Sequence, residues 1–413
     1  MTLHRTGICF FLLLMPLSVQ AQGFSGYAEA MGGAYAEQWP GRDRLGLGRG
    51  TFFVKWEEKT GDTQLTASVR GEQIASDGEG TQLFDPADRE LRRSPLSLRD
   101  FWLRVPLGSA DDLQLGRFQL GWGKTDGYSP ADAFLPRDLT DPFADEKISL
   151  WGVRLTGYSG ALRYEAVAAP VTTPWRLPPL GSRAAPFHSG SVPAGTLFKE
   201  VESAPPGIGF AAVRLQVALG EWELGGWGRG GVRAAPLLAF RTDQADYISG
   251  RLTVPVERRY AREEAAGIEL SRIIGSLIVR GEGAALFSRE RDLGNALIGA
   301  LSIEKGFGDG TLLVTLAGNA ITPPVDAAQL FDRAVLPALI TAWHRSEEWG
   351  EWRLVWSAGL KHVDGLCKGE VSYAIDDVWK MTVGAELPYG SRTGPLGGLY
   401  PARNVHLALR RSW

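Results

Sequence analysis

From Gly23 to the C-terminus, apolar and polar residues alternate one by one in short segments. The segment 210–219 is the clearest case, because every second residue is apolar while Arg214 and Gln216 fall on the opposite face. Side chains of a β-strand point alternately to its two faces, so this period of two predicts strands with one apolar and one polar side. The same alternation recurs in the segments 65–72, 277–282, 352–361, 379–387 and 404–413.

Short and long connections alternate between these segments. The short ones are 59–62, 108–110, 159–160, 220, 274–275, 306–310 and 376–377, and the long ones are 76–95, 123–146, 171–205, 233–263, 322–338 and 388–401. Short turns at one end and long loops at the other are typical of a transmembrane barrel. We therefore predict an all-β, antiparallel, up-and-down transmembrane β-barrel of about 18 strands. Sixteen strands is the alternative, because 247–256 and 339–345 are ambiguous.

The polar phase of these strands carries arginines and carboxylates in mixture. An arginine on the lipid face at mid-bilayer costs about 2–4 kcal/mol, whereas one in a wet lumen costs little. The polar phase is therefore expected to face the lumen. The arginines assigned to it are Arg70, Arg104, Arg154, Arg214, Arg280 and Arg353. A barrel of 18 strands would enclose an aqueous channel unless loops fill it.

Residues 1–21 combine a basic start, a short apolar run and small residues, which predicts a cleaved secretory signal. The apolar run is shorter than the roughly 20 residues that a spanning helix needs. Residues 22–413 contain no linker or internal repeat, so we expect one barrel domain, located in the cell outer membrane. The 14 Trp and 10 Tyr suit aromatic girdles at the membrane interfaces. Outer-membrane lipid and the barrel-assembly machinery are the expected partners, and the oligomeric state stays open.

Composition and spacing argue against several other functions. The net charge of −3 and the absence of a basic run give no indication of nucleic-acid binding. After residue 21 only Cys367 remains, and the histidines lack a metal-ligand spacing such as H-x-x-x-H, so no metal or cofactor is expected. His344 and Ser346 share a strand face, but such pairs occur by chance, and no nucleophile motif accompanies them. We therefore expect no enzyme and no catalytic residue.

The segment 123–146 is too long for a hairpin turn and is interrupted by three prolines. In the 18-strand scheme it is the third loop on the long-loop side, where it would enter and narrow the lumen. Its acids would then act as a selectivity ring. The alternative is that aspartates such as Asp126, Asp132 and Asp138 stabilise turns through their own backbone. The residues assigned to the pore constriction are Arg117, Asp126, Asp132, Arg137, Asp138 and Asp141.

The block from Gly116 to Asp132, followed by Leu135–Leu139, resembles a recurring G-R-x-x-x-x-W-G-x-x-D…P…D…P-x-D-L segment of Gram-negative porin-like barrels. These include the family called domain of unknown function 1302 and, more loosely, the alginate-export and phosphate-selective porins. The alternating C-terminal strand ending on Trp413 is similar to the terminal strand of outer-membrane proteins, which the assembly machinery recognises. Arg411 departs from that pattern, since this position is often apolar.

These observations predict a passive or substrate-selective channel for small solutes, with a lumen narrowed by an acidic loop. The alternatives are an export barrel coupled to a periplasmic pump, a lipase-like barrel enzyme, and a structural barrel plugged by its loops.

Overall fold

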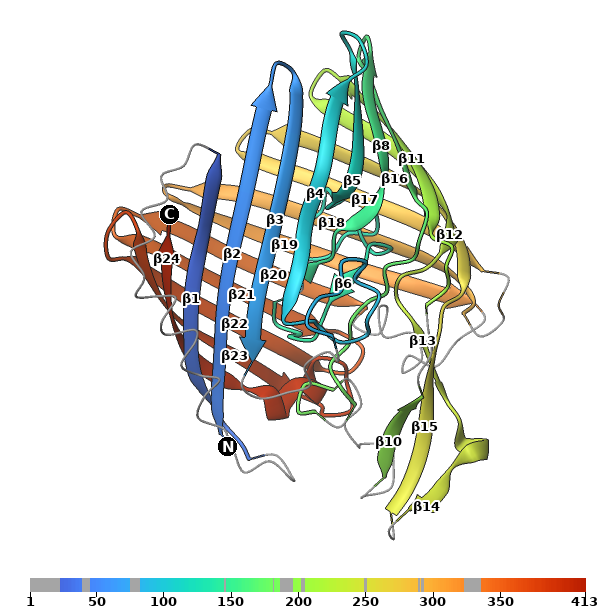
Figure 1. Ribbon diagram of the computed structural model, residues 1–413, viewed down its shortest axis with the longest axis vertical. Coiled ribbons are helices and arrows are strands. Elements are labelled where there is room, and N and C mark those ends of the chain that lie inside the picture. Colours follow the sequence, from blue (N-terminus) through green and yellow to red (C-terminus); the bar gives the residue numbers. More distant parts are fainter. Residues whose placement is uncertain are drawn as a thin grey trace.

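The computed structural model describes residues 23–38, 45–74, 82–144, 146–180, 182–185, 196–201, 205–248, 251–288, 290, 293–322 and 336–413. The predicted signal, residues 1–21, lies outside the described residues. Eighteen antiparallel strands form the barrel wall (Figure 1). They are β1 (Phe24–Tyr35), β2 (Gly46–Thr60), β3 (Thr63–Ile74), β4 (Leu96–Pro106), β5 (Asp111–Phe118), β8 (Leu150–Ser159), β9 (Leu162–Ala169), β11 (Phe210–Leu219), β12 (Trp222–Val232), β16 (Arg262–Ile274), β17 (Leu277–Ser288), β18 (Asn295–Phe307), β19 (Gly310–Thr322), β20 (Ala338–Glu347), β21 (Gly350–Gly359), β22 (Asp364–Ala374), β23 (Trp379–Gly390) and β24 (Asn404–Ser412).

The barrel closes where the first strand pairs with the last. β1 and β24 are antiparallel, from Tyr27 opposite Ser412 to Tyr35 opposite Asn404. Gly26 and Trp413 extend this seam by exchanging two backbone hydrogen bonds of 3.1 Å each. The prediction of a closed 18-stranded antiparallel barrel is therefore confirmed.

Short turns join the strands at one end of the barrel, the end marked by the C-terminus in Figure 1. At the other end, the connections after β3, β5, β9, β12 and β19 are long. The expected contrast between the two ends is incomplete, because β21 and β22 are joined there by only residues 360–363. The ambiguous segment 339–345 lies in β20, whereas 247–248 and 251–256, the described residues of the other ambiguous segment, lie outside the barrel wall.

That outlying segment belongs to a small sheet beyond the loop end of the barrel (Figure 1). β15 (Arg251–Arg259) is its central strand, with β10 (Leu197–Val201) parallel to it and β13 (Leu237–Phe240) and β14 (Asp246–Ile248) antiparallel. The described residues also form two short 3₁₀ helices, η1 (Thr242–Gln244) and η3 (Gly397–Ala402). No helix among the described residues is long and apolar enough to cross a membrane.

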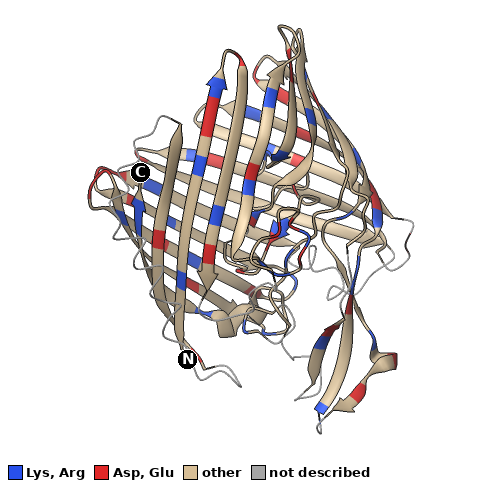
Figure 2. Cartoon of the chain, in the orientation of Figure 1, with Lys and Arg blue, Asp and Glu red and all other residues tan. Residues whose placement is uncertain are grey.

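The wall is apolar outside and polar inside. On β11, Val213 and Leu215 are 56% and 51% exposed, whereas Arg214 and Gln216 between them are each 6% exposed. This is the reverse of a water-soluble fold, in which exposed strand positions are mainly polar. Figure 2 shows charged residues gathering around the loops inside the barrel and thinly spread along the strands. The outer surface therefore suits a lipid environment, and the buried charges point to an interior filled largely by protein.

Candidate functional site

The connection between β5 and β8, residues 119–149, folds into the barrel, and we call it the third loop. It contains a two-residue ladder formed by β6 (Arg137–Asp138) and β7 (Glu146–Lys147). Figure 1 shows β6 within the outline of the barrel. In chain order this loop is the third connection at the loop end, after those that follow β1 and β3.

Glu282 on β17 anchors this loop to the wall. Its Oε1 accepts hydrogen bonds from the backbone N–H groups of Lys124 and Thr125, the latter at 2.6 Å. Its Oε2 accepts from Ser129 Oγ at 2.7 Å and from Ala131 N at 3.0 Å. Hydrogen bonds to a charged acceptor are stronger than those between neutral groups. One wall carboxylate that is 6% exposed therefore fixes the turn 124–131.

Asp132 organises the next turn in a similar way. Its Oδ1 accepts from the backbone N–H groups of Trp122 and Gly123 at 2.8 and 3.0 Å, and its Oδ2 lies 2.5 Å from Lys147 Nζ. The Trp122 indole donates to Glu165 Oε1 on β9 at 2.6 Å. The two arms of the third loop are thus joined to each other and to the wall.

Apolar packing holds the loop against one side of the lumen. Trp122 and Phe134 meet edge to face at 5.8 Å between ring centroids, and Phe134 packs on Phe210 and Trp227. Burying a large apolar side chain contributes about 1.5–3 kcal/mol. The inward-facing wall residues of this cluster include small side chains that make room for the loop: Ala212, Ala265, Ala284, Ala296, Ala300, Ala317 and Ala338.

Ion pairs link the third loop to the connection after β3. Asp138 Oδ2 lies 2.8 Å from Arg93 Nε and 3.3 Å from Arg176 Nη1. Arg93 also pairs with Glu72 on β3. Glu146 pairs with Arg70 on the same strand, at 2.5 Å. Three separate connections are thereby joined into one charged core.

The pKa of Asp138 reports the balance of forces in this core. Burial alone would raise the pKa of Asp138, but the guanidinium groups of Arg93 and Arg176 outweigh it and hold the pKa well below its usual range. The carboxylate is therefore ionised and neutralised by its neighbours, and it stabilises the loop when charged.

Two cavities that described residues line in the lumen are relevant to a solute path. The one nearer the loop end has a volume of about 130 Å³ and lies between the third loop and β1, β2 and β22–β24. The one nearer the short turns has a volume of about 570 Å³ and lies between the loop and β18–β22. Glu370 on β22 lines both cavities. A path along this side of the barrel would therefore pass Glu370.

The larger cavity is rich in carboxylates. It is lined by Asp126, Glu304, Glu351 and Glu370, with Arg353 as the arginine among its lining residues. Asp126, whose side chain is 57% exposed, lies 3.3 Å from Arg280. Burial raises the pKa of Asp126, and the nearby Glu304 and Glu282 raise it further against the opposing effect of Arg280.

The residues assigned to the constriction from sequence fall into two groups. Asp126 and Asp141 line the larger and the smaller cavity respectively. Arg117, Asp132 and Asp138 are only 1–6% exposed. Arg117 pairs with Asp88, so its charge is also used inside the protein. Burial therefore argues against these three as a selectivity ring, and the turn-stabilising alternative describes Asp132 and Asp138 better.

Arg137 is half-buried on β6. The six arginines assigned to the lumen make these contacts: Arg70 with Glu72 and Glu146, Arg104 with Asp112, Arg154 with Glu165, Arg214 with Glu269 and the Trp122 carbonyl, Arg280 with Asp126 and Glu304, and Arg353 with the larger cavity.

The mixture of arginines and carboxylates predicted for the inward phase assigns no individual role to Glu282 or Glu386. Their partners lie far away in the chain, so no local signal could identify them. Glu370 was overlooked, although its phase on β22 was open to the same argument.

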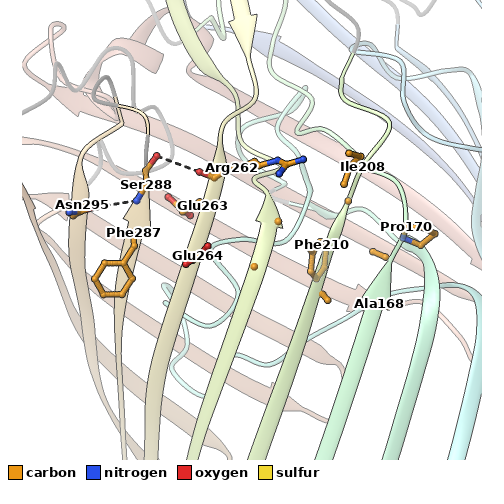
Figure 3. A pocket seen from close by; sticks show the side chains of 15 residues that line it. Ala168, Pro170, Ile208, Phe210, Arg262, Glu263, Glu264, Phe287, Ser288 and Asn295 are labelled. Carbon is orange, nitrogen blue, oxygen red and sulfur yellow. Dashed lines mark hydrogen bonds between the residues drawn. The ribbon is translucent and has the colours of Figure 1, made fainter.

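A further pocket, of about 780 Å³, lies on the outer face near the loop end (Figure 3). Exposed side chains line it, among them Arg262, Glu264 and Phe287. Ser288 donates its backbone N–H to Asn295 Oδ1 at 3.1 Å at its rim. Glu263, which is 3% exposed, also belongs to its lining.

Comparisons with known proteins support the fold. No family model matches the chain, and no curated protein matches it either. The crystal structure of Acinetobacter baumannii OccAB1 is similar over 95% of this chain and 97% of its own, with 9% identity and a TM-score of 0.52. A triple mutant of the Rhodopseudomonas blastica porin is similar over 94% of this chain and 99% of its own, with 7% identity and a TM-score of 0.39. The chain thus shares its barrel fold with the solved OccAB1 structure, while its resemblance to the domain of unknown function 1302 and alginate-export groups stays a prediction.

Proposed function

We propose that the protein is an outer-membrane channel through which small solutes diffuse along the side of the lumen that the third loop leaves open. The observation that carries this proposal is that Glu370 borders both lumenal cavities, so one continuous wall of β22 leads from the loop end toward the short turns. The closed barrel and its apolar outer surface support a membrane location, and the predicted signal in residues 1–21 supports export.

We expect this channel to favour cations. The larger cavity presents the carboxylates of Asp126, Glu351 and Glu370 to solvent, and rings of acidic side chains favour cations in pores. The third loop fills much of the section, so the unitary conductance should be well below that of an open barrel of 18 strands.

Planar-bilayer recording under a salt gradient tests this function. Stepwise conductance with a cation-selective reversal potential is expected, and Glu370→Gln and Asp126→Asn should each move that potential toward zero. Asp377→Asn is the matched control, because it removes one exposed carboxylate from a short turn outside both cavity linings. Folded barrels that never conduct would overturn the proposal and favour a plugged barrel.

The surroundings of His344, which with Ser346 was the candidate catalytic pair, give little support for an enzyme. His344 lies in the larger cavity with its Nε2 3.4 Å from Glu351 Oε2, so its described partner is a carboxylate. A hydrolytic site would need the imidazole hydrogen-bonded to a serine hydroxyl.

A further inference from the structure

Three ligand-bearing side chains meet in the smaller cavity on adjacent strands. They are Glu370 on β22, Glu386 on β23 and His406 on β24, and one ligand atom from each lies within 4.8 Å of the others. All three line the smaller cavity. They are separated by 16 to 36 positions in the chain, which is why no spacing in the sequence indicates a metal site.

Cross-strand register brings them together. Gly384 on β23 is paired with Glu370 on one side and with His406 on the other. A Cβ built on Gly384 would lie 2.4 Å from His406 Nε2 and 3.3 Å from Glu370 Cγ. The glycine therefore leaves the space in which the imidazole and the carboxylate approach each other.

The imidazole is oriented by its neighbours. His406 Nδ1 lies 3.2 Å from Asn404 Oδ1 and 3.5 Å from Glu386 Oε2. In the neutral ring, a proton on Nδ1 that is donated to Asn404 Oδ1 leaves the lone pair on Nε2, on the side of Gly384 and Glu370, and leaves the Glu386 carboxylate available as a ligand. Such outer hydrogen bonds fix the tautomer of metal-binding histidines.

We propose that Glu370, Glu386 and His406 bind one divalent transition-metal ion, with Zn²⁺ as the best match. Zn²⁺ accepts mixed nitrogen and oxygen ligands and is held in many sites by three protein ligands and a water. Mg²⁺ and Ca²⁺ prefer oxygen ligands alone and need six or more of them, so the imidazole disfavours both.

Lys368 opposes the ion and gives the proposal a second, independent consequence. Its Nζ lies 3.2 Å from Glu370 Oε1, so an incoming cation must compete with the ammonium group. Removing that positive charge in Lys368→Met should strengthen binding, while removing a ligand should weaken it.

Binding would also alter conduction, a consequence that rests on the proposed channel function. An ion at this position adds positive charge beside Glu370, which lines both cavities. Zn²⁺ should therefore reduce the cation current at concentrations near its dissociation constant.

Calorimetric titration of Zn²⁺ into the detergent-solubilised full-length barrel tests the site without relying on conduction. One ion per chain is expected, with affinity at least about tenfold weaker in His406→Gln and Glu370→Gln and stronger in Lys368→Met. His344→Gln is the matched control, because it removes a lumenal histidine that also contacts a carboxylate, Glu351. Mg²⁺ should not displace the Zn²⁺.

The heat-modifiable mobility of each variant shows that the barrel is folded before it is titrated. Wild-type protein that binds no Zn²⁺, or equal affinity in the wild type and His406→Gln, would overturn the proposal. Failure of the channel proposal would look different, since metal-free wild type would then show no conductance while the calorimetry still reported binding.

Discussion

Replacing Glu282 by Gln should release the third loop while leaving the barrel closed. The carboxylate accepts from the backbone N–H groups of Lys124, Thr125 and Ala131 and from the Ser129 hydroxyl. A glutamine keeps one acceptor oxygen but turns its amide N–H toward Ala131 N. A buried donor left without a partner costs about 1–3 kcal/mol, and each remaining hydrogen bond weakens when its acceptor loses its charge. We estimate the combined loss at about 2–4 kcal/mol of local stability.

Hydrogen exchange of the loop amides measures that loss directly. Local opening governs exchange in such segments, and about 1.4 kcal/mol corresponds to a factor of ten. The amides of Thr125 and Ala131 should therefore exchange about 30-fold to 1,000-fold faster in Glu282→Gln, and single-channel current should become larger and noisier. Glu264→Gln is the control, because this exposed glutamate lies on the outer face, in the pocket of Figure 3. Unchanged exchange in a folded Glu282→Gln barrel would refute the assignment of Glu282 as the anchor.

Three further predictions concern the loop and the closing seam. Deleting Trp413 removes the two backbone hydrogen bonds with Gly26, so the yield of heat-modifiable barrels in the outer membrane should fall severalfold, and normal assembly would contradict this. The pKa of Asp138 is lower in the folded than in the unfolded protein, so its carboxylate stabilises the fold above the unfolded pKa of about 4. This stabilisation is lost as the pH falls through the folded pKa. Proteolysis of the loops should therefore accelerate only below about pH 4. Asp132→Asn should speed hydrogen exchange of the third loop, yet it should shift the reversal potential less than Glu370→Gln does. A larger shift of the reversal potential in Asp132→Asn than in Glu370→Gln would restore Asp132 as a selectivity residue.

Strand positions could be predicted because successive residues of a barrel strand face lipid and lumen in turn, so apolar and polar residues alternate in the sequence. The alternation in 210–219 predicts that Arg214 faces inward and Val213 outward, and their exposures of 6% and 56% agree. Local turn signals also located most short connections. The short connection 360–363 was not predicted. It lies at the loop end of the barrel, where the scheme of long loops expects a long connection.

Contacts inside the lumen could not be predicted, because they depend on register between distant segments. Glu282 meets its loop partners 151 to 158 positions away. Asp138 is neutralised by Arg93 and Arg176, which belong to two other connections. Local sequence around Asp138 shows an acidic, proline-rich segment, and around Glu282 an ordinary alternating strand, and neither pattern distinguishes carboxylates that face a channel from carboxylates that are paired.

The placement of these charges changes the role that the third loop plays in selectivity. Its buried aspartates Asp132 and Asp138 hold the loop to itself and to the connections after β3 and β9, so their fields are largely cancelled by the donors and guanidinium groups around them. Charges that reach open cavity surface are contributed mainly by the wall opposite the loop, where Glu370 lines both cavities. Under the proposed channel function, we expect the loop to direct a solute to one side of the wall, and we expect the wall carboxylates on that side, Glu351 and Glu370, to set the ion preference.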